Sequence, residues 1–295
     1  MTAALIVVAA AAMLTGGALA AVNHFLGAWT APSDAIRPRC VATTELGEAS
    51  LDPEQAANAA LIAAVGQARS MSPRAVAIAL ATAMQESKLR NLDYGDRDSL
   101  GLFQQRPSQD WGSPEEIMDP LYSAGEFYSA LAQVPGFETM AITEAAQAVQ
   151  RSAFPDAYAN HEIAARSLAS TLTGHTPGGL TCVLGSADEP ASAARVVGAF
   201  RSEWGDAPAD LATVADGWAG AGTTPPQPTE VALRADSTTR AWAYAQWAVA
   251  KADQLGIDSV TVEGRAWTRS AGVWEAAPSP AEDLGTAGRV TLQLA

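Results

Sequence analysis

Cysteine, histidine and basic residues are all scarce in this chain of 295 residues. There are two cysteines, three histidines, and 18 Lys and Arg against 32 Asp and Glu, which leaves a formal net charge of −14. Nucleic-acid binding requires a basic face, so this balance argues against a nucleic-acid partner. His24, His161 and His175 are scattered and show no metal-ligand spacing with the cysteines, so neither a metal site nor a cofactor is expected.

Bulky hydrophobic residues are also fewer than the composition first suggests. Hydrophobic residues make up 48% of the chain and charged residues 17%, which is ordinary for a globular protein, and 295 residues are enough for two modest domains. Much of the hydrophobic content is alanine, and alanine favours closely packed helices. We therefore expect a mainly α fold.

The N-terminal segment lacks charge altogether. Residues Ala3 to Val22 form an uncharged segment that is long enough to cross a bilayer as a helix. Within it, Ala18 to Ala20 has the form of a signal cleavage site. We predict that 1–22 is a signal peptide or an uncleaved membrane anchor, with a buried helix as the third alternative. Either of the first two places the protein outside the cytoplasm, secreted or held at the membrane, and 23–49 follows as a tether.

One acid, Glu86, ends a long apolar stretch. Ser72 to Met84 carries no acid, Ser72 can cap a helix, and Pro73 fits its first position. Glu86 falls in the last turn, where burial and the negative end of the helix dipole both disfavour the charged carboxylate. Both effects are expected to favour the protonated carboxyl, and a general acid at near-neutral pH must hold its proton until it donates it. The alternative is an ordinary helix-end acid that pairs with a neighbouring Lys or Arg.

The residues after Glu86 follow a known pattern. Glu86-Ser87, then Tyr94 to Arg97, then Gly101 to Gln104 resemble the signature of goose-type lysozymes and soluble lytic transglycosylases. Tyr158 to Asn160 is similar to the tyrosine segment that opens the last helix of the same fold. The resemblance extends from about Leu51 to Gly174 and implies an all-α lysozyme-like domain.

The resemblance also implies an activity, the cleavage of peptidoglycan glycan strands at the bond between N-acetylmuramic acid and N-acetylglucosamine. Glu86 would be the general acid. In an inverting muramidase Asp96 would activate water, whereas in a lytic transglycosylase Glu86 alone would act as acid and then base. The residues expected to bind substrate are Ser87, Gln104, Gln105, Gln150 and Tyr158.

Two positions depart from the pattern. Arg106 stands where those enzymes have a second aspartate, and Ala148-Val149-Gln150 replaces their Ala-Tyr-Asn turn. A non-catalytic peptidoglycan-binding or scaffold protein that retains the fold is therefore the alternative function.

The two cysteines bracket the lysozyme-like region. Cys40 lies just before it and Cys182 just after it. In an oxidising compartment they would form one disulfide that ties its two ends together, and two unpaired buried thiols are the alternative.

The remaining boundaries give a lysozyme-like domain at 50–184, a helix and Gly/Pro-rich linker at 185–230, and a small α+β module at 231–295. In the module we predict a helix at Thr238–Leu255 and strands at Ile257–Glu263 and Arg289–Leu294, with Ala266–Trp274 as a third candidate strand. Its four tryptophans are expected in the core, not on a sugar-binding face, and its partners are not predicted. They are Trp242, Trp247, Trp267 and Trp274.

Overall fold

The computed structural model describes residues 37–152, 156–187, 191–205, 212–214, 229–277 and 288–295. The predicted signal or anchor segment and most of the predicted linker lie outside these residues. From Pro38 onward the chain forms one unit. Within the described part of the chain, no helix is both long enough and apolar enough to cross a bilayer.

Five helices form the core of the predicted lysozyme-like region. They are α2 (Pro53–Ala68), α3 (Pro73–Ser87), α5 (Pro120–Ala132), α6 (Ile142–Gln150) and α7 (Glu162–Leu172). Three short helices join them, η1 (Pro107–Gln109), α4 (Pro114–Ile117) and η2 (Ala157–His161). Helix α3 packs against α2, α5, α6, α7 and η2, so it lies at the centre of this group.

The helix starts follow from their caps. The Asp52 side chain accepts from the backbone N–H of Gln55 while the Gln55 side chain accepts from Asp52, and Pro53 takes the first helical position. Ser72 caps α3 by accepting from the backbone N–H of Ala75. These local signals are the ones from which the α3 start was predicted.

A three-stranded antiparallel sheet flanks these helices. Its strands are β1 (Arg39–Thr44), β2 (Gly47–Leu51) and β3 (Leu180–Val183), in the order β2-β1-β3. Cys40 and Cys182 lie directly opposite each other in β1 and β3 and form a disulfide. The predicted disulfide is therefore confirmed. It joins two strands that are already paired.

The C-terminal part contains a second antiparallel sheet. Its strands are β4 (Ala212–Val214), β5 (Glu230–Arg234), β6 (Ile257–Val262), β7 (Arg265–Thr268), β8 (Trp274–Ala276) and β9 (Arg289–Leu294), in the order β4-β5-β9-β6-β7-β8. Two helices belong to this part, α8 (Ala193–Trp204) and α9 (Thr238–Leu255).

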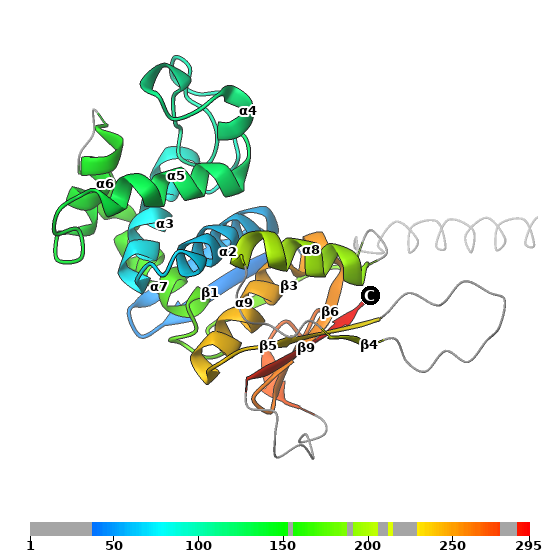
Figure 1. The fold of residues 1–295 in the computed structure, drawn as a ribbon. Helices are drawn as coiled ribbons and strands as arrows, with labels where there is room; N and C mark the ends of the chain where they lie inside the picture. Colours follow the sequence, from blue (N-terminus) through cyan, green and yellow to red (C-terminus); the bar gives the residue numbers. More distant parts are fainter. Residues whose placement is uncertain (1–36, 153–155, 188–190, 206–211, 215–228, 278–287) are drawn as a thin grey trace, which may run out of the picture. The chain divides into compact units, whose positions relative to one another are not determined.

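Helix α9 connects the C-terminal part to the helices that precede it. It packs against the sheet through β6 and β9 and against α2 and α7 on its other sides, and Figure 1 shows α2 running beside α8 and α9. Trp242, Trp247, Trp267 and Trp274 are all buried, so their predicted place in the core is confirmed.

The predicted fold class is wrong. The protein is not mainly α with a small α+β module but a mixed α/β fold with two antiparallel sheets. The strands Arg39–Thr44 and Gly47–Leu51 lie in and just after the stretch predicted as a tether, and β5 was not predicted. Strands β1, β2 and β5 are only five or six residues long, and β1 and β5 each pair with a strand far away in the chain, so local propensity does not distinguish them from loops.

Candidate functional site

Glu86 lies at the C-terminal end of a buried helix. The residues from Ala75 to Ala83 are all buried, and the helix ends where Lys88 adopts a left-handed backbone conformation, with φ of 56°. Glu86 itself is half-buried. The buried helix α3 therefore places the Glu86 carboxyl where the core ends, at the wall of a cavity. The apolar pattern of α3 predicts that this helix is buried.

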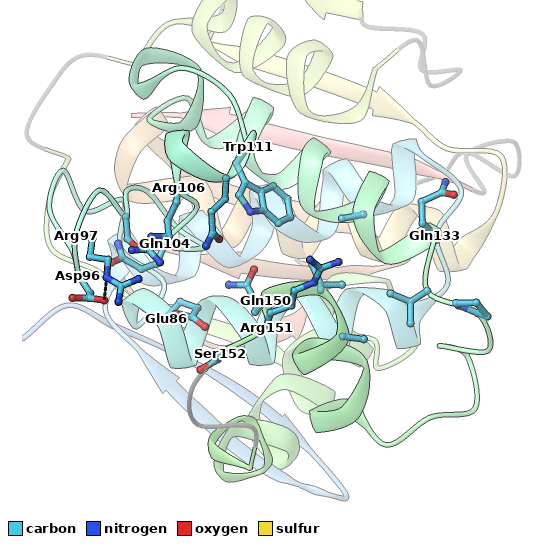
Figure 2. Close-up of a pocket in the computed structure, with 17 residues that line it drawn as sticks. Glu86, Asp96, Arg97, Gln104, Arg106, Trp111, Gln133, Gln150, Arg151 and Ser152 are labelled. Carbon is cyan, nitrogen blue, oxygen red and sulfur yellow. Dashed lines mark ion pairs between the residues drawn. The ribbon is translucent and has the colours of Figure 1, made fainter.

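The cavity has a volume of about 1200 Å³. The end of α3 forms it together with the loop that follows, the end of α5 and the end of α6 (Figure 2). Its charged lining consists of the carboxylates of Glu86 and Asp96 and three arginines, Arg97, Arg106 and Arg151. Its amide and aromatic lining consists of Gln104, Gln109, Gln133, Gln150 and Trp111.

Tyr158 holds one oxygen of the Glu86 carboxyl. The Tyr158 hydroxyl donates to Oε1 of Glu86 at 2.7 Å, and the tyrosine is fully buried in η2. Burial, and then the hydrogen bond to Glu86, raise the pKa of Tyr158, so this hydroxyl keeps its proton and acts as the donor. Because Oε1 accepts from Tyr158, a proton on the Glu86 acid belongs on Oε2.

The turn that contains Phe103 is fixed from two sides. The Ser87 hydroxyl donates to the carbonyl of Leu102 at 2.7 Å, and the Gln150 side-chain amide donates to the carbonyl of Phe103 at 2.7 Å. The Phe103 ring is buried and stacks on Phe127 with 4.6 Å between ring centroids. The loop after α3 is thus attached to α3, α5 and α6, all of which reach the cavity.

Gln104 explains the glycine in the Tyr94-Gly95-Asp96-Arg97 segment. Its side-chain amide donates to the carbonyls of Tyr94 and Gly101, each at 3.3 Å. A Cβ on Gly95 would lie 2.0 Å from Oε1 of Gln104, so only glycine leaves room for this contact. Gln104 therefore lines the cavity and also closes its loop.

Asp96 lies at the edge of the cavity with an exposed side chain, 89% accessible. Its carboxylate is 3.9 Å from Nε of Arg97, and Figure 2 shows this pair at one end of the group, beyond Glu86. Asp98, in contrast, accepts from the backbone N–H of Ser108 at 2.8 Å and from Nε of Arg106 at 3.2 Å. Hydrogen bonds from the Ser108 hydroxyl and amide, and then from Arg106, lower the pKa of Asp98 to about 2.

The predicted site residues separate into two groups. Glu86, Asp96, Gln104 and Gln150 line the cavity. The others lie behind its wall: Ser87, Gln105 and Tyr158 are buried, and their side chains bond to the backbone or to Glu86.

Among the amide and aromatic lining residues, three were missed from the sequence: Gln109, Trp111 and Gln133. Gln133 follows the end of α5 and belongs to no motif, so nothing local marks it. The sequence did offer a signal for Trp111, because an aromatic residue in a polar loop can stack its face on a sugar ring. In the structure its indole is half-buried.

No protein-family model matches the sequence, and no curated protein matches it either. The resemblance to goose-type lysozymes and lytic transglycosylases therefore rests on the quoted residues and stays a prediction. Within the described residues, no group of three or more His, Cys, Asp or Glu side chains is arranged to hold a metal ion.

Proposed function

We propose that the protein cleaves the glycan strands of peptidoglycan, with Glu86 as the general acid. The observation that carries the proposal is the half-buried Glu86 carboxyl on the cavity wall, with Oε1 held by Tyr158 at 2.7 Å. This contact leaves Oε2 to carry the proton that the glycosidic oxygen would receive. The resemblance of the segments around Glu86 to glycan-cleaving enzymes supports the same chemistry.

The other cavity residues suit a saccharide. Side-chain amides can donate to hydroxyl and acetamido oxygens and accept from hydroxyl and acetamido hydrogens, and the cavity has four of them. Trp111 adds an aromatic surface for the apolar face of a sugar ring. A volume of about 1200 Å³ accommodates more than one sugar unit.

The position of Asp96 favours the transglycosylase route over the inverting muramidase route. An inverting enzyme needs a second carboxylate across the sugar to activate water. Asp96 is exposed and faces Arg97, and Arg106 stands where a second aspartate would help to hold that water. Glu86 would then protonate the leaving oxygen and afterwards take the proton of the muramic acid C6 hydroxyl. Once the glycosidic bond has broken, that oxygen bonds to the anomeric carbon as its proton passes to Glu86, which closes a 1,6-anhydro ring and consumes no water.

A clearing assay tests the proposal. Protein comprising residues 37–295 should reduce the turbidity of a peptidoglycan suspension, and Glu86→Gln should abolish the reduction while leaving binding to the peptidoglycan intact. Mass analysis of the released fragments separates the two routes, because an anhydro end is lighter than a reducing end by one water.

The non-catalytic alternative gives a different result in the same assay. A wall-binding or scaffold protein would bind peptidoglycan equally well with Glu86 or Gln at this position, and neither protein would clear the suspension. That outcome would refute the enzymatic proposal.

A further inference from the structure

The cavity carries more positive charge than the rest of the chain would suggest. The whole protein has a formal net charge of −14, yet three arginines and only two carboxylates line this cavity. Arg106 is paired with Asp98 at 3.2 Å, and Arg97 lies 3.9 Å from Asp96. Arg151 is different. Its guanidinium has no ion pair or hydrogen bond to any residue that the structure describes.

The backbone fixes Arg151 beside the site. The residue before it, Gln150, is anchored through its side chain to the carbonyl of Phe103, and the Arg151 backbone N–H donates to the carbonyl of Gln147. Figure 2 shows Arg151 next to Gln150, on the side of Glu86 that lies away from the Asp96–Arg97 pair.

The backbone conformation at position 151 does not favour arginine. Arg151 ends α6 in the left-handed conformation, with φ of 52°, where glycine or asparagine is the usual choice. A cation at a helix C-terminus gains a little from the helix dipole, and this is the competing explanation of Arg151. If the helix dipole were the whole explanation, Arg151 would have no effect on which ligand the cavity binds.

We propose that Arg151 binds a carboxylate of the substrate and thereby makes the cavity select anionic glycan over neutral glycan. The inference rests on the proposed function and names a specificity-determining residue of that site. A guanidinium suits this role because its planar donors match both oxygens of a carboxylate. The acidic surface repels an anionic polymer at long range, so a local cation is needed to hold it.

Two sources could supply the carboxylate. One is the lactyl group of a muramic acid residue that carries no peptide, and the other is a carboxylate of an attached stem peptide. The two sources differ in a simple respect, because attachment of the peptide converts the lactyl carboxylate to an amide.

The test measures binding to three ligands in a Glu86→Gln background, which prevents turnover. The ligands are peptide-free muramic acid–glucosamine oligosaccharides, the same oligosaccharides with stem peptides, and neutral N-acetylglucosamine oligosaccharides of equal length. Arg151→Gln and Arg151→Lys are compared with Arg201→Gln, which removes one charge from an exposed position on α8 outside the cavity. Thermal unfolding of each variant establishes that the fold is retained.

We expect Arg151→Gln to weaken binding of at least one anionic ligand about tenfold, the loss of one charge-assisted contact, and to leave the neutral ligand unchanged. The ligand affected identifies the source of the carboxylate. Arg151→Lys should recover part of the loss, and Arg201→Gln should bind all three ligands as the parent does.

Two results would overturn the inference alone: an equal loss for neutral and anionic ligands, or no loss for any of them. If the Glu86→Gln parent bound none of the three glycans, the proposed function would fail, and the role of Arg151 with it. Failure of the specificity claim is therefore distinct from failure of the activity.

Discussion

The hydroxyl of Tyr158 donates to Oε1 of Glu86 at 2.7 Å, although 72 positions of sequence separate the two residues. Glu86 ends α3 and Tyr158 lies in η2, and these two elements pack against each other. The contact fixes the orientation of a carboxyl that is otherwise at the wall of an open cavity. It also determines which of its two oxygens can face a ligand.

Tyr158→Phe should lower kcat about 10- to 100-fold with little change in KM, because the hydrogen bond orients the acid and the tyrosine does not line the cavity. Steady-state kinetics on soluble glycan strands measure both parameters. A variant with unchanged kcat would show that Tyr158 does not position the acid.

Tyr128→Phe is the matched control. Its hydroxyl is also buried and donates to the carbonyl of Ile62 at 3.0 Å, but it does not line the cavity. Both substitutions should cost about 1 kcal/mol of unfolding free energy, and only Tyr158→Phe should change kcat. Equal kinetic effects of the two would indicate a general loss of stability.

The sequence predicts the parts of the site that local rules control. Ser72, Pro73 and the acid-free run after them fix the start and the buried character of α3, and so they place Glu86 at its end. The relation of Glu86 to Tyr158, Gln150 and Trp111 depends on how α5, α6 and η2 pack, which no local spacing encodes. The hydrogen bond from Ser87 to the carbonyl of Leu102, 15 positions along the chain, was not predicted for the same reason.

The sheets were harder to predict than the helices. Strand β1 pairs with β3, with Cys40 opposite Cys182 at a sequence separation of 142. Its sequence, RCVATT, is short and carries polar residues, so propensity alone does not distinguish it from a loop. The cysteines were the one local sign that these segments meet, and from them a link was predicted but not a sheet.

Lys251→Met should destabilise the fold by roughly 3–5 kcal/mol, because it leaves a buried carboxylate without its cation. Lys251 Nζ lies 2.6 Å from Oε1 of Glu203, and Trp247 donates to Oε2 of the same carboxylate at 2.6 Å. Both charged side chains are less than 8% exposed. Urea unfolding at neutral pH gives the difference in unfolding free energy.

The double variant Glu203→Gln with Lys251→Met separates the ion pair from the packing. The neutral amide still offers an oxygen to Trp247 and carries no charge to leave unpaired, so most of the lost stability should return. A double variant as unstable as Lys251→Met alone would show that packing of the lysine chain, not its charge, is what matters.

Removal of the disulfide should lower the unfolding free energy by about 4–5 kcal/mol in the chain-entropy model. Cys40 and Cys182 close a loop with a sequence separation of 142, which is a large restriction on the unfolded chain. Urea unfolding with and without reductant measures the effect. The Cys40→Ala, Cys182→Ala double variant should match the reduced protein and be insensitive to reductant, and unfolding that is the same in both conditions would refute the expected contribution.

His161 should make stability rise with pH. Burial lowers the pKa of His161 below its ordinary value of 6.5, and the ring bonds to Oε1 of Gln85 at 3.1 Å, next to Glu86. Between the lowered pKa of the folded state and the ordinary pKa of the unfolded state, the unfolded chain binds more protons. The folded protein is therefore penalised in full below the lowered pKa, and the penalty disappears as the pH rises through 6.5.

The comparison of wild type with His161→Gln isolates this effect from that of other titrating groups. Thermal unfolding midpoints measured across the interval around the ordinary histidine pKa should rise more steeply with pH for wild type than for His161→Gln. His175→Gln is the control, because that ring is exposed, and it should keep the wild-type slope. If His161→Gln also kept that slope, burial of His161 would not be a source of the pH dependence.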